Sequence, residues 1–400
     1  MSRLAIDGGL PVRVDPMPGW PVYDAEDLES VRAVLASGRV NYWTGEHGRA
    51  FEAELAEAVG TTHAVALANG TVALELALRA LGTGPGDEVI VPAATFIATA
   101  SAVAACGARP VVVDVDPDSM TLTADTVAPA VTEATVAVVV VHLAGHPADL
   151  APLLALARAH GLRVVEDCAQ AHGARYRDRP VGGLGDIAAW SFCQDKIIST
   201  AGEGGAVTTS DPLLWRRCWE LKDHGKSWAT TREPAASGFR WVHDDFGTNA
   251  RMTEVQAVVG RNQLRALPGW TKQRAANATE LAEALRDQPA VRVLEPSADV
   301  EHAYYRCYLR VCQERLAPGW DRDRIVAAVG AEGVPARQGG CMEIYRERAF
   351  RRFPATPRSL PVAARLGRTC LALPVHPTLE RADVADMAEA LTKVLAEAST

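Results

Sequence analysis

A lysine at the end of a strand-like segment is the first residue of this sequence whose surroundings suggest chemistry. Residues 186–192 read as a strand, Lys196 follows them, and a turn containing Gly202, Gly204 and Gly205 comes next. Glycines let the backbone approach a ligand closely, and open α/β sheets bind ligands at the carboxyl ends of their strands. A lysine amine placed there can attack a carbonyl carbon, whereas the plainer alternative is an ordinary exposed lysine.

Three further segments carry groups that would complement this amine. Asp167 ends the run Val-Val-Glu-Asp, where its carboxylate can point into the same cleft, although it can also serve as a cap. Asn69, Gly70 and Thr71 stand between a predicted strand and a predicted helix, a place that suits either a bound phosphate or an ordinary turn. Phe96 offers a flat ring that either stacks on a ligand or fills the core.

Together these groups match the requirements of pyridoxal phosphate (PLP). That cofactor needs a lysine amine for its aldehyde and a carboxylate for its pyridine nitrogen. It also needs a flat group over its ring and backbone donors for its phosphate. No single segment is specific, but their order along the chain favours a PLP site: phosphate turn, aromatic ring, strand-end aspartate, lysine, glycine turn.

The elements that would hold these groups alternate between strands and helices. Short β-branched runs predict strands at 63–67, 88–91, 109–113, 135–141, 163–166, 187–191 and 206–208. Ala- and Leu-rich stretches with helical spacing predict helices at 71–81, 95–106 and 150–160. This pattern indicates an α/β domain around a largely parallel sheet whose strands are covered on both faces.

After about Arg251 the pattern changes to that of a smaller α+β unit. A helical stretch at 253–285, with a break expected at Pro268, leads to a strand-like run at 303–311. Amphipathic stretches follow at 322–331 and 381–396. We therefore predict a large domain over residues 1–265 and a small C-terminal domain over 266–400. Residues 1–25, which show no periodicity, are expected to form an N-terminal arm that wraps on one of the two domains.

Composition excludes several classes of protein. The 400 residues carry a net charge of −8, without the basic character that nonspecific nucleic-acid binding requires. No apolar run approaches the ~20 residues of a membrane span, and the N-terminus lacks the apolar core of a signal peptide, so we expect a cytoplasmic protein. The eight cysteines are scattered with no spacing suited to zinc, so no metal site is expected.

Over nearly its whole length the sequence resembles the DegT/DnrJ/EryC1/StrS family of PLP-dependent sugar aminotransferases. The motifs that carry the resemblance include NYWTGEHGRAFE, NGTVALELAL, VPAATFIATA, VVEDCAQAHGA, SFCQDKIISTAGEGGAV, KDHGK, FGTNARMTEVQA and LPVHPTL. The resemblance implies PLP-dependent transferase fold type I. This fold has a large domain with a central, mostly parallel sheet and a smaller C-terminal α+β domain.

The resemblance also assigns roles to residues at matching positions. Lys196 corresponds to the Schiff-base lysine, Asp167 to the partner of the pyridine nitrogen, and Gln170 to a residue near the ring hydroxyl. The other positions belong to the phosphate or the ring: Gly70, Thr71 and Ser191 hold the phosphate, and Phe96 stacks on the ring. In family members the asparagine of the N-x-R-M motif, here Asn249, reaches the phosphate from the neighbouring subunit. A homodimer with its active site at the subunit interface is therefore expected.

The function implied is transfer of an amino group from L-glutamate or L-glutamine to a keto sugar, most simply a nucleotide-linked one. A ketocyclitol, a free keto sugar acid and a non-catalytic PLP-binding protein remain alternatives. Related sugar dehydratases carry histidine in place of the lysine, which Lys196 argues against. A nicotinamide-dependent oxidoreductase needs G-x-G-x-x-G after a strand, and the glycines at 82–86 and 182–185 lack that spacing.

Some substrate contacts stay open at this stage. The loop between His224 and Asn249 is longer than expected for many family members, and it either lines the substrate pocket or lies on the surface. Trp43, His224, Trp228 and Arg251 are candidate substrate contacts, and each has an equally simple structural role.

Overall fold

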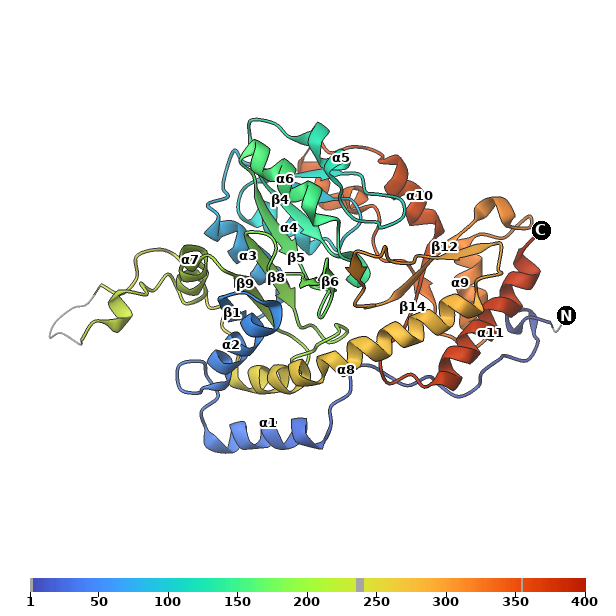
Figure 1. Ribbon diagram of the computed structural model, residues 1–400, viewed down its shortest axis with the longest axis horizontal. Coiled ribbons are helices and arrows are strands. Elements are labelled where there is room, and N and C mark those ends of the chain that lie inside the picture. Colours follow the sequence, from blue (N-terminus) through green and yellow to red (C-terminus); the bar gives the residue numbers. More distant parts are fainter. Residues whose placement is uncertain (1–2, 235–240, 354) are drawn as a thin grey trace.

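A seven-stranded sheet forms the centre of the molecule (Figure 1). The computed structural model describes residues 3–234, 241–353 and 355–400. Across the sheet the strands run in the order β1 (His63–Leu67), β9 (Gly205–Thr209), β8 (Ile187–Ser191), β5 (Arg163–Asp167), β4 (Thr135–Val141), β2 (Glu88–Pro92) and β3 (Arg109–Val113). All of these strands were predicted, with ends that differ by at most one residue.

Every neighbouring pair in this sheet is parallel except the two that include β9, which runs antiparallel to β1 and β8. The predicted α/β fold with a mostly parallel sheet is therefore confirmed. Side chains alternate between two separate cores, as in β4, where Val139 and Val141 face one core and Val138 and Val140 the other. Parallel strands end at one edge of the sheet, so residues that follow β1, β2, β4, β5 and β8 are brought together there.

Helices cover both faces of the sheet. One core includes residues of α3 (Gly70–Ala80), α4 (Ala98–Ala105) and α7 (Pro212–Lys222). The other includes residues of α2 (His47–Val59), α6 (Leu150–His160) and α8 (Glu254–Ala284). The short helix α5 (Ala124–Val127) also belongs to this part, and α1 (Ala25–Ser37) packs on α8. Neither α1 nor α2 was predicted, because the alternating strand–helix signal begins only at β1.

Helix α8 continues through Pro268, so the predicted break there is wrong. The helix begins with a capping box at Thr253 and runs for 31 residues. A proline inside a helix removes one backbone hydrogen bond, but α8 packs against α1, α2 and α11 (Arg381–Ala398) along its length. We attribute the unbroken helix to this packing, which outweighs the local preference of proline.

The C-terminal part contains a second, antiparallel sheet. Its strands run in the order β10 (Val291–Val293), β12 (Cys307–Val311), β14 (Cys370–Leu373) and β13 (Arg337–Gln338), with α9 (Arg322–Ala331), α10 (Pro361–Thr369) and α11 beside them. A third, small sheet joins β11 (Val300–Glu301), β6 (Arg175–Tyr176) and β7 (Arg179–Pro180). The predicted boundary between residues 265 and 266 falls inside α8, and the division into two domains stays a prediction.

The N-terminal segment is fastened to the C-terminal part. The buried Glu332 side chain accepts hydrogen bonds from the backbone N–H groups of Ala5 (2.8 Å) and Val12 (3.0 Å). Arg13 forms ion pairs with Asp383 (2.7 Å) and Asp386 (2.9 Å) at the start of α11. The segment then runs along the molecule toward α1 (Figure 1), and its Trp20 contacts the backbone of Lys196 beside the central sheet.

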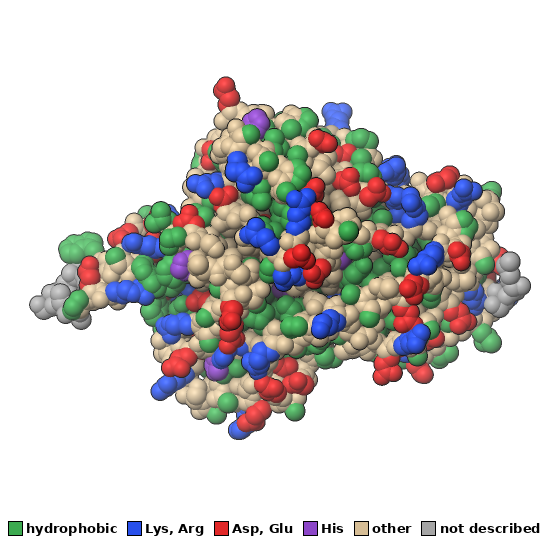
Figure 2. All heavy atoms as spheres, viewed as in Figure 1, with side chains coloured by type: hydrophobic (Ala, Val, Ile, Leu, Met, Phe, Trp, Pro, Cys, Tyr) green, Lys and Arg blue, Asp and Glu red, His purple; other side chains and the backbone are tan. Residues whose placement is uncertain are grey.

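Two properties of the molecule bear on where it can bind. Among the described residues, no helix is both long and apolar enough to cross a membrane. Figure 2 shows acidic and basic side chains mixed over the face that it draws.

Candidate active site

The carboxyl-terminal edge of the central sheet opens into a cavity of about 820 Å³. The sides of this cavity come from α3, from the segments after β2, β5 and β8, and from the residues around β12 and β13. Of the eight residues assigned to the site from the sequence, all but one line it: Gly70, Thr71, Phe96, Asp167, Gln170, Ser191 and Lys196. The exception is Asn249.

The first turn of α3 forms one end of the cavity. Asn69 caps the helix by accepting the Val72 N–H (2.9 Å), which leaves the preceding N–H groups directed beyond the helix end. Ser191, the last residue of β8, packs so closely on this turn that a Cβ at position 70 would lie 2.5 Å from the Ser191 Cβ. The glycine therefore allows a helix N-terminus and a hydroxyl to lie side by side, an arrangement suited to an anion such as phosphate.

This close approach gives a first prediction. Gly70→Ala is expected to push α3 away from β8 and to lower the affinity for PLP at least about tenfold, because a misplaced helix end loses charge-assisted hydrogen bonds. Titration of the cofactor-free protein with PLP, followed by absorbance, measures the change. Gly84→Ala is the matched control, since a Cβ at Gly84 would come no closer than 4.0 Å to a neighbouring atom. Equal affinities for the two variants would contradict the assignment of this turn.

Asp167 lies at the base of the cavity with only 5% of its surface exposed. Its Oδ2 accepts the Thr99 hydroxyl (3.0 Å) and its Oδ1 accepts the Ala169 N–H (3.2 Å). Burial raises the pKa of this carboxyl above its ordinary value, although the two hydrogen bonds and the nearby Lys196 charge oppose the rise. A cationic ring nitrogen beside Asp167 would favour the ionised form, so the site suits a protonated heterocycle.

Lys196 lies between the Asp195 and Tyr305 side chains. Its Nζ is 3.9 Å from Asp195 Oδ1 and 4.8 Å from the centre of the Tyr305 ring. The Lys196 carbonyl accepts the indole N–H of Trp20 (2.7 Å), so the N-terminal segment supports the lysine backbone directly. The backbone of Lys196 is thus held in place, and its side chain is only 16% exposed.

The remaining residues assigned from the sequence differ in position. Phe96 is 65% exposed at the cavity and is not a core residue, which excludes one of its two predicted roles. Gln170 Oε1 accepts the Ala144 N–H (2.7 Å), which orients the amide beside the cavity. Asn249 is exposed and forms a β-bridge with Asp223, outside the cavity wall.

None of the four candidate substrate contacts lines this cavity. Trp43 and Trp228 instead line a separate hollow of about 360 Å³ with Trp215 and Trp219. Arg251 binds Asp223, and His224 lies in the turn just before Gly225. Residues 235–240 of the long loop are outside the described part of the chain.

Several cavity residues escaped the sequence reasoning. Thr95 and Thr99 are spaced one helical turn apart and hydrogen-bond to each other (2.8 Å), and this spacing was the one available local signal. Tyr305 donates a hydrogen bond to Asp195, which Arg306 also contacts (3.4 Å). Tyr305 and Arg306 are far from Asp195 in the sequence, so no local pattern predicts these contacts.

Three buried residues beside the cavity carry atoms of the kinds that bind metal ions, but His142 and Glu166 use theirs for hydrogen bonds within the protein. Oxygen, nitrogen and sulfur atoms of His142, Glu166 and Cys168 lie within 4.8 Å of one another. Glu166 accepts the His142 Nε2–H (3.1 Å), because His142 Nδ1 accepts the Ala148 N–H. It also accepts backbone N–H groups of the glycine-rich turn at 182–185. Glu166 therefore ties that turn to β5. This structural role accounts for the glycines at 182–185 without a bound dinucleotide.

An amine, a buried acid and a helix N-terminus around one cavity fit the functional groups of PLP. The fit rests on the open first turn of α3, the exposed Phe96 ring and the Asp167 carboxyl, which among the described residues has no cationic partner within hydrogen-bond distance.

Comparison of the fold places the chain among the aminotransferases. The crystal structure of an aminotransferase from Psychrobacter cryohalolentis matches it with a TM-score of 0.93 and 46% identity, covering 95% of this chain and 99% of that one. The chain belongs to the DegT/DnrJ/EryC1/StrS aminotransferase family, whose model matches residues 21–392. The family membership expected from the sequence is thus confirmed.

Two characterised relatives show the range of the family. The dTDP-3-amino-3,4,6-trideoxy-alpha-D-glucose transaminase of Streptomyces venezuelae is 40% identical over 357 residues, which is 89% of either chain. The L-glutamine:2-deoxy-scyllo-inosose aminotransferase of Streptomyces kanamyceticus is 36% identical over 419 residues, 98% of this chain and 97% of that one. One name specifies a nucleotide-linked sugar and the other a cyclitol, so identity alone does not choose between these substrates.

Proposed function

We propose that this aminotransferase uses PLP to move an amino group from L-glutamate or L-glutamine to a keto sugar, in the simplest case a nucleotide-linked one. The observation that carries the proposal is the position of Lys196 and Asp167 at one cavity with the open end of α3. A ketocyclitol or a free keto sugar acid is the alternative acceptor, and a non-catalytic PLP-binding protein is the alternative function. A cytoplasmic location stays a prediction.

Different residues of the chain would hold different parts of PLP. Gly70, Thr71 and Ser191 would hold the phosphate, Asp167 the ring nitrogen, and Phe96 one face of the ring, with Gln170 near the ring hydroxyl. When bound, PLP supplies an aldehyde that condenses with amines and a ring that withdraws electrons from the adjacent carbon.

Lys196 would first hold the cofactor and then act as the acid and base of the reaction. Its Nζ would take a proton from the substrate carbon and return it to the cofactor carbon, which general acid–base catalysis requires. The Asp195 carboxylate and the Tyr305 ring beside Nζ limit where the free amine can go, so they would help to keep it inside the cavity. Burial opposes ionisation of Asp195, but the Lys196 charge and the Tyr305 hydroxyl lower its pKa below the ordinary value.

An absorbance spectrum tests the proposal. The purified protein is expected to be yellow with PLP, and addition of excess L-glutamate or L-glutamine is expected to convert the bound cofactor to its colourless amine form. Borohydride reduction of the yellow protein should attach the cofactor to Lys196, which peptide mass analysis identifies. A protein that binds PLP but responds to neither amino acid would favour the non-catalytic alternative.

The same proposal includes a homodimer whose subunits share each active site. Three observations support it: Asn249 is exposed outside its own chain's cavity, Phe246 beside it is 93% exposed, and Phe96 is 65% exposed. In Figure 1 the segment after α7 extends away from the body of the chain. Large exposed aromatic rings, such as Phe246 on this segment and Phe96 at the cavity, are typical of a surface that a second copy covers.

A hybrid dimer tests this arrangement. Lys196→Ala and Asn249→Ala homodimers are each expected to be nearly inactive, whereas their co-expressed mixture should recover about a quarter of the wild-type activity. About half of the dimers in a random mixture are hybrids, and each hybrid has one intact site of two. Activity that stays at the level of the separate variants, with hybrids demonstrated by mass spectrometry, would place Asn249 in its own subunit's site or in none.

A further inference from the structure

The N-terminal segment touches the loop that carries Lys196 at two points. The indole N–H of Trp20 donates to the Lys196 carbonyl (2.7 Å), and the Tyr23 hydroxyl donates to the Ser199 hydroxyl (3.2 Å). From α8, the Gln263 side chain accepts the Ser199 N–H (2.8 Å). Two elements from distant parts of the sequence, the N-terminal segment and α8, therefore hold this loop.

The Trp20 ring is itself held by three flat groups. The Arg274 guanidinium lies 4.9 Å from the ring centre, and the Trp270 ring meets it edge-on with the two centres 4.9 Å apart. The His376 ring lies nearly parallel to it, with the centres 6.2 Å apart. Rings and guanidinium groups attract one another in these arrangements, so together they favour one orientation of the indole N–H.

Arg274 links this stack to the other side of the Lys196 amine. Its Nη1 donates to the backbone carbonyls of Tyr304 (3.2 Å) and Tyr305 (3.4 Å). The Tyr305 ring in turn lies 4.8 Å from Lys196 Nζ. Trp20 thus contacts the backbone that carries the amine, and Arg274, which lies against Trp20, contacts the backbone that carries the ring beside the amine.

Stability alone does not account for Arg274. Only 1% of its surface is exposed, and burial lowers its pKa to about 9, so it is still charged at neutral pH. Within the described chain, its Nε and Nη2 have no hydrogen-bond partner. A buried arginine with unpaired donors lowers the stability of a fold, and residues that do so are most often found at functional sites.

We infer that Trp20 and Arg274 are positioning residues for catalysis, which together fix the Lys196 amine relative to the Tyr305 ring. Neither residue lines the cavity that contains the amine, so both act through the backbone that they contact. The inference rests on the proposed function, in which the amine moves a proton.

The expected effect on rate is large compared with the effect on stability. Displacement of a catalytic group by about 1 Å costs roughly 10²-fold in rate, because proton transfer requires close alignment. One hydrogen bond between uncharged groups, in contrast, contributes only a little to the free energy of unfolding. A residue that positions the amine and one that merely fills space therefore give different results.

Trp20→Phe removes the hydrogen bond but keeps a flat ring against Arg274. We expect kcat for amino transfer to fall at least about tenfold, with KM for the donor within about twofold of wild type, because the amine is displaced and the cavity is not. The melting temperature should change by no more than about 4 °C. Steady-state rates and thermal melting measure these quantities.

Hydrogen–deuterium exchange of the cofactor-free protein supplies a readout that does not depend on activity. The backbone N–H groups of Lys196, Ser199 and Thr200 are all hydrogen-bonded, so their exchange reports opening of the loop. Exchange at 193–202 should be faster in Trp20→Phe, and exchange in α6 should stay as in wild type. A general loss of stability would speed exchange in both segments.

Arg274→Lys tests the second half of the pair. Lysine keeps the charge but has no planar group to lie against the Trp20 ring, so kcat should fall here as well. If the two residues act as one unit, the double variant should lose less activity than the product of the two single losses, because coupled residues are not additive.

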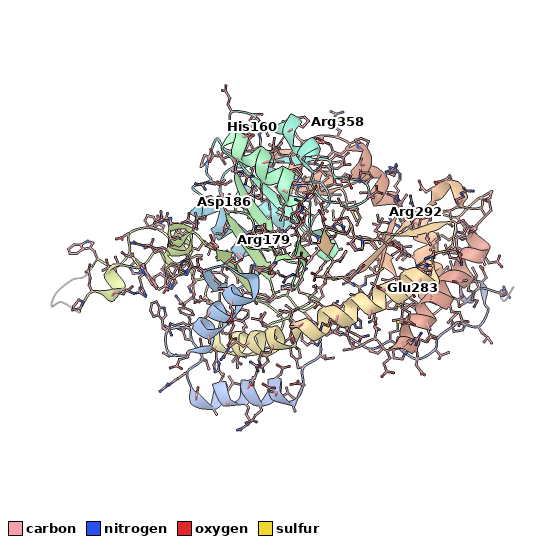
Figure 3. All side chains as sticks on the ribbon, in the orientation of Figure 1. His160, Arg179, Asp186, Glu283, Arg292 and Arg358 are labelled. Atoms are coloured by element: carbon pink, nitrogen blue, oxygen red, sulfur yellow. The ribbon has the colours of Figure 1, made fainter. Side chains whose placement is uncertain are left out.

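Two matched variants exclude a general effect of the substitutions. Trp320 also has an arginine over its ring, Arg324 at 4.3 Å, but lines neither the cavity that contains Lys196 nor the hollow beside Trp20. Arg292 is an exposed arginine on β10 (Figure 3). Trp320→Phe and Arg292→Lys should leave kcat and exchange at 193–202 unchanged.

The outcomes are separable from those of the proposed function. If Trp20→Phe keeps the wild-type kcat, or leaves exchange at 193–202 unchanged, the inference is wrong even when the donor converts the cofactor normally. A fall in kcat that Trp320→Phe reproduces also contradicts it. If no donor changes the spectrum of the wild-type protein, the proposed function fails, and exchange at 193–202 still decides whether Trp20 holds the lysine loop.

Discussion

Replacing Lys196 by alanine is expected to lower the rate of amino transfer by at least about 10³-fold, the largest effect of any single substitution in this chain. The Lys196 amine lies in the cavity beside Asp195 and Tyr305. Alanine offers no group that could move the proton between the two reacting carbons. PLP should still bind through the first turn of α3, so the loss should appear in kcat more than in cofactor content.

Two comparisons make the Lys196 result specific. Lys272→Ala removes an exposed lysine on α8 and should leave activity unchanged. Added methylamine should restore part of the activity of Lys196→Ala, because a small free base can take the empty place of the side chain. Retention of a tenth or more of the activity by the alanine variant would show that another group moves the proton.

Asp167→Asn is expected to separate activity from stability. Activity should fall by roughly 10²–10³-fold, because a neutral amide no longer stabilises positive charge on the ring nitrogen within a buried site. The cofactor-free protein, in contrast, should become more stable at neutral pH. The pKa of Asp167 is raised in the folded chain, so folding favours the protonated carboxyl. Its stabilising contribution is present at low pH and is lost as the pH rises through the folded pKa.

The measurement is thermal melting of the cofactor-free proteins between pH 4 and 8 together with steady-state rates of the loaded ones. The melting temperature of Asp167→Asn should exceed that of wild type by an amount that grows with pH. Thr99 can accommodate the amide, because its hydroxyl can turn to donate to Thr95 Oγ1, 2.8 Å away. Asp287→Asn, an exposed control, should change neither property. A less stable Asp167→Asn protein at pH 8 would contradict the raised pKa.

The sequence predicts the strand ends better than it predicts what faces them. Asp167 ends a strand, Lys196 and the Gly70 turn each follow one, and parallel strands bring such positions to one edge whatever lies between them. Their meeting at one cavity therefore depends on local signals and one rule of topology. The same reasoning predicted the central sheet within a residue at each strand end.

What the sequence could not predict comes from contacts between distant segments. Tyr305 and Asp195 are 110 positions apart, and Trp20 and Lys196 are 176 apart, so neither pair leaves a local pattern. Pro268 shows the opposite case, in which a strong local rule is overridden by packing on three other helices.

The attachment of the N-terminal segment has a consequence for the way the chain is made. Arg13 pairs with Asp383 and Asp386 on the last helix, and Trp20 holds the carbonyl of Lys196. A ribosome delivers Arg13 long before it delivers Asp383 and Asp386. Contacts that span so much of the sequence form slowly. During synthesis the central sheet can therefore fold before release, whereas the ion pairs that fasten Arg13 form only after α11 has appeared.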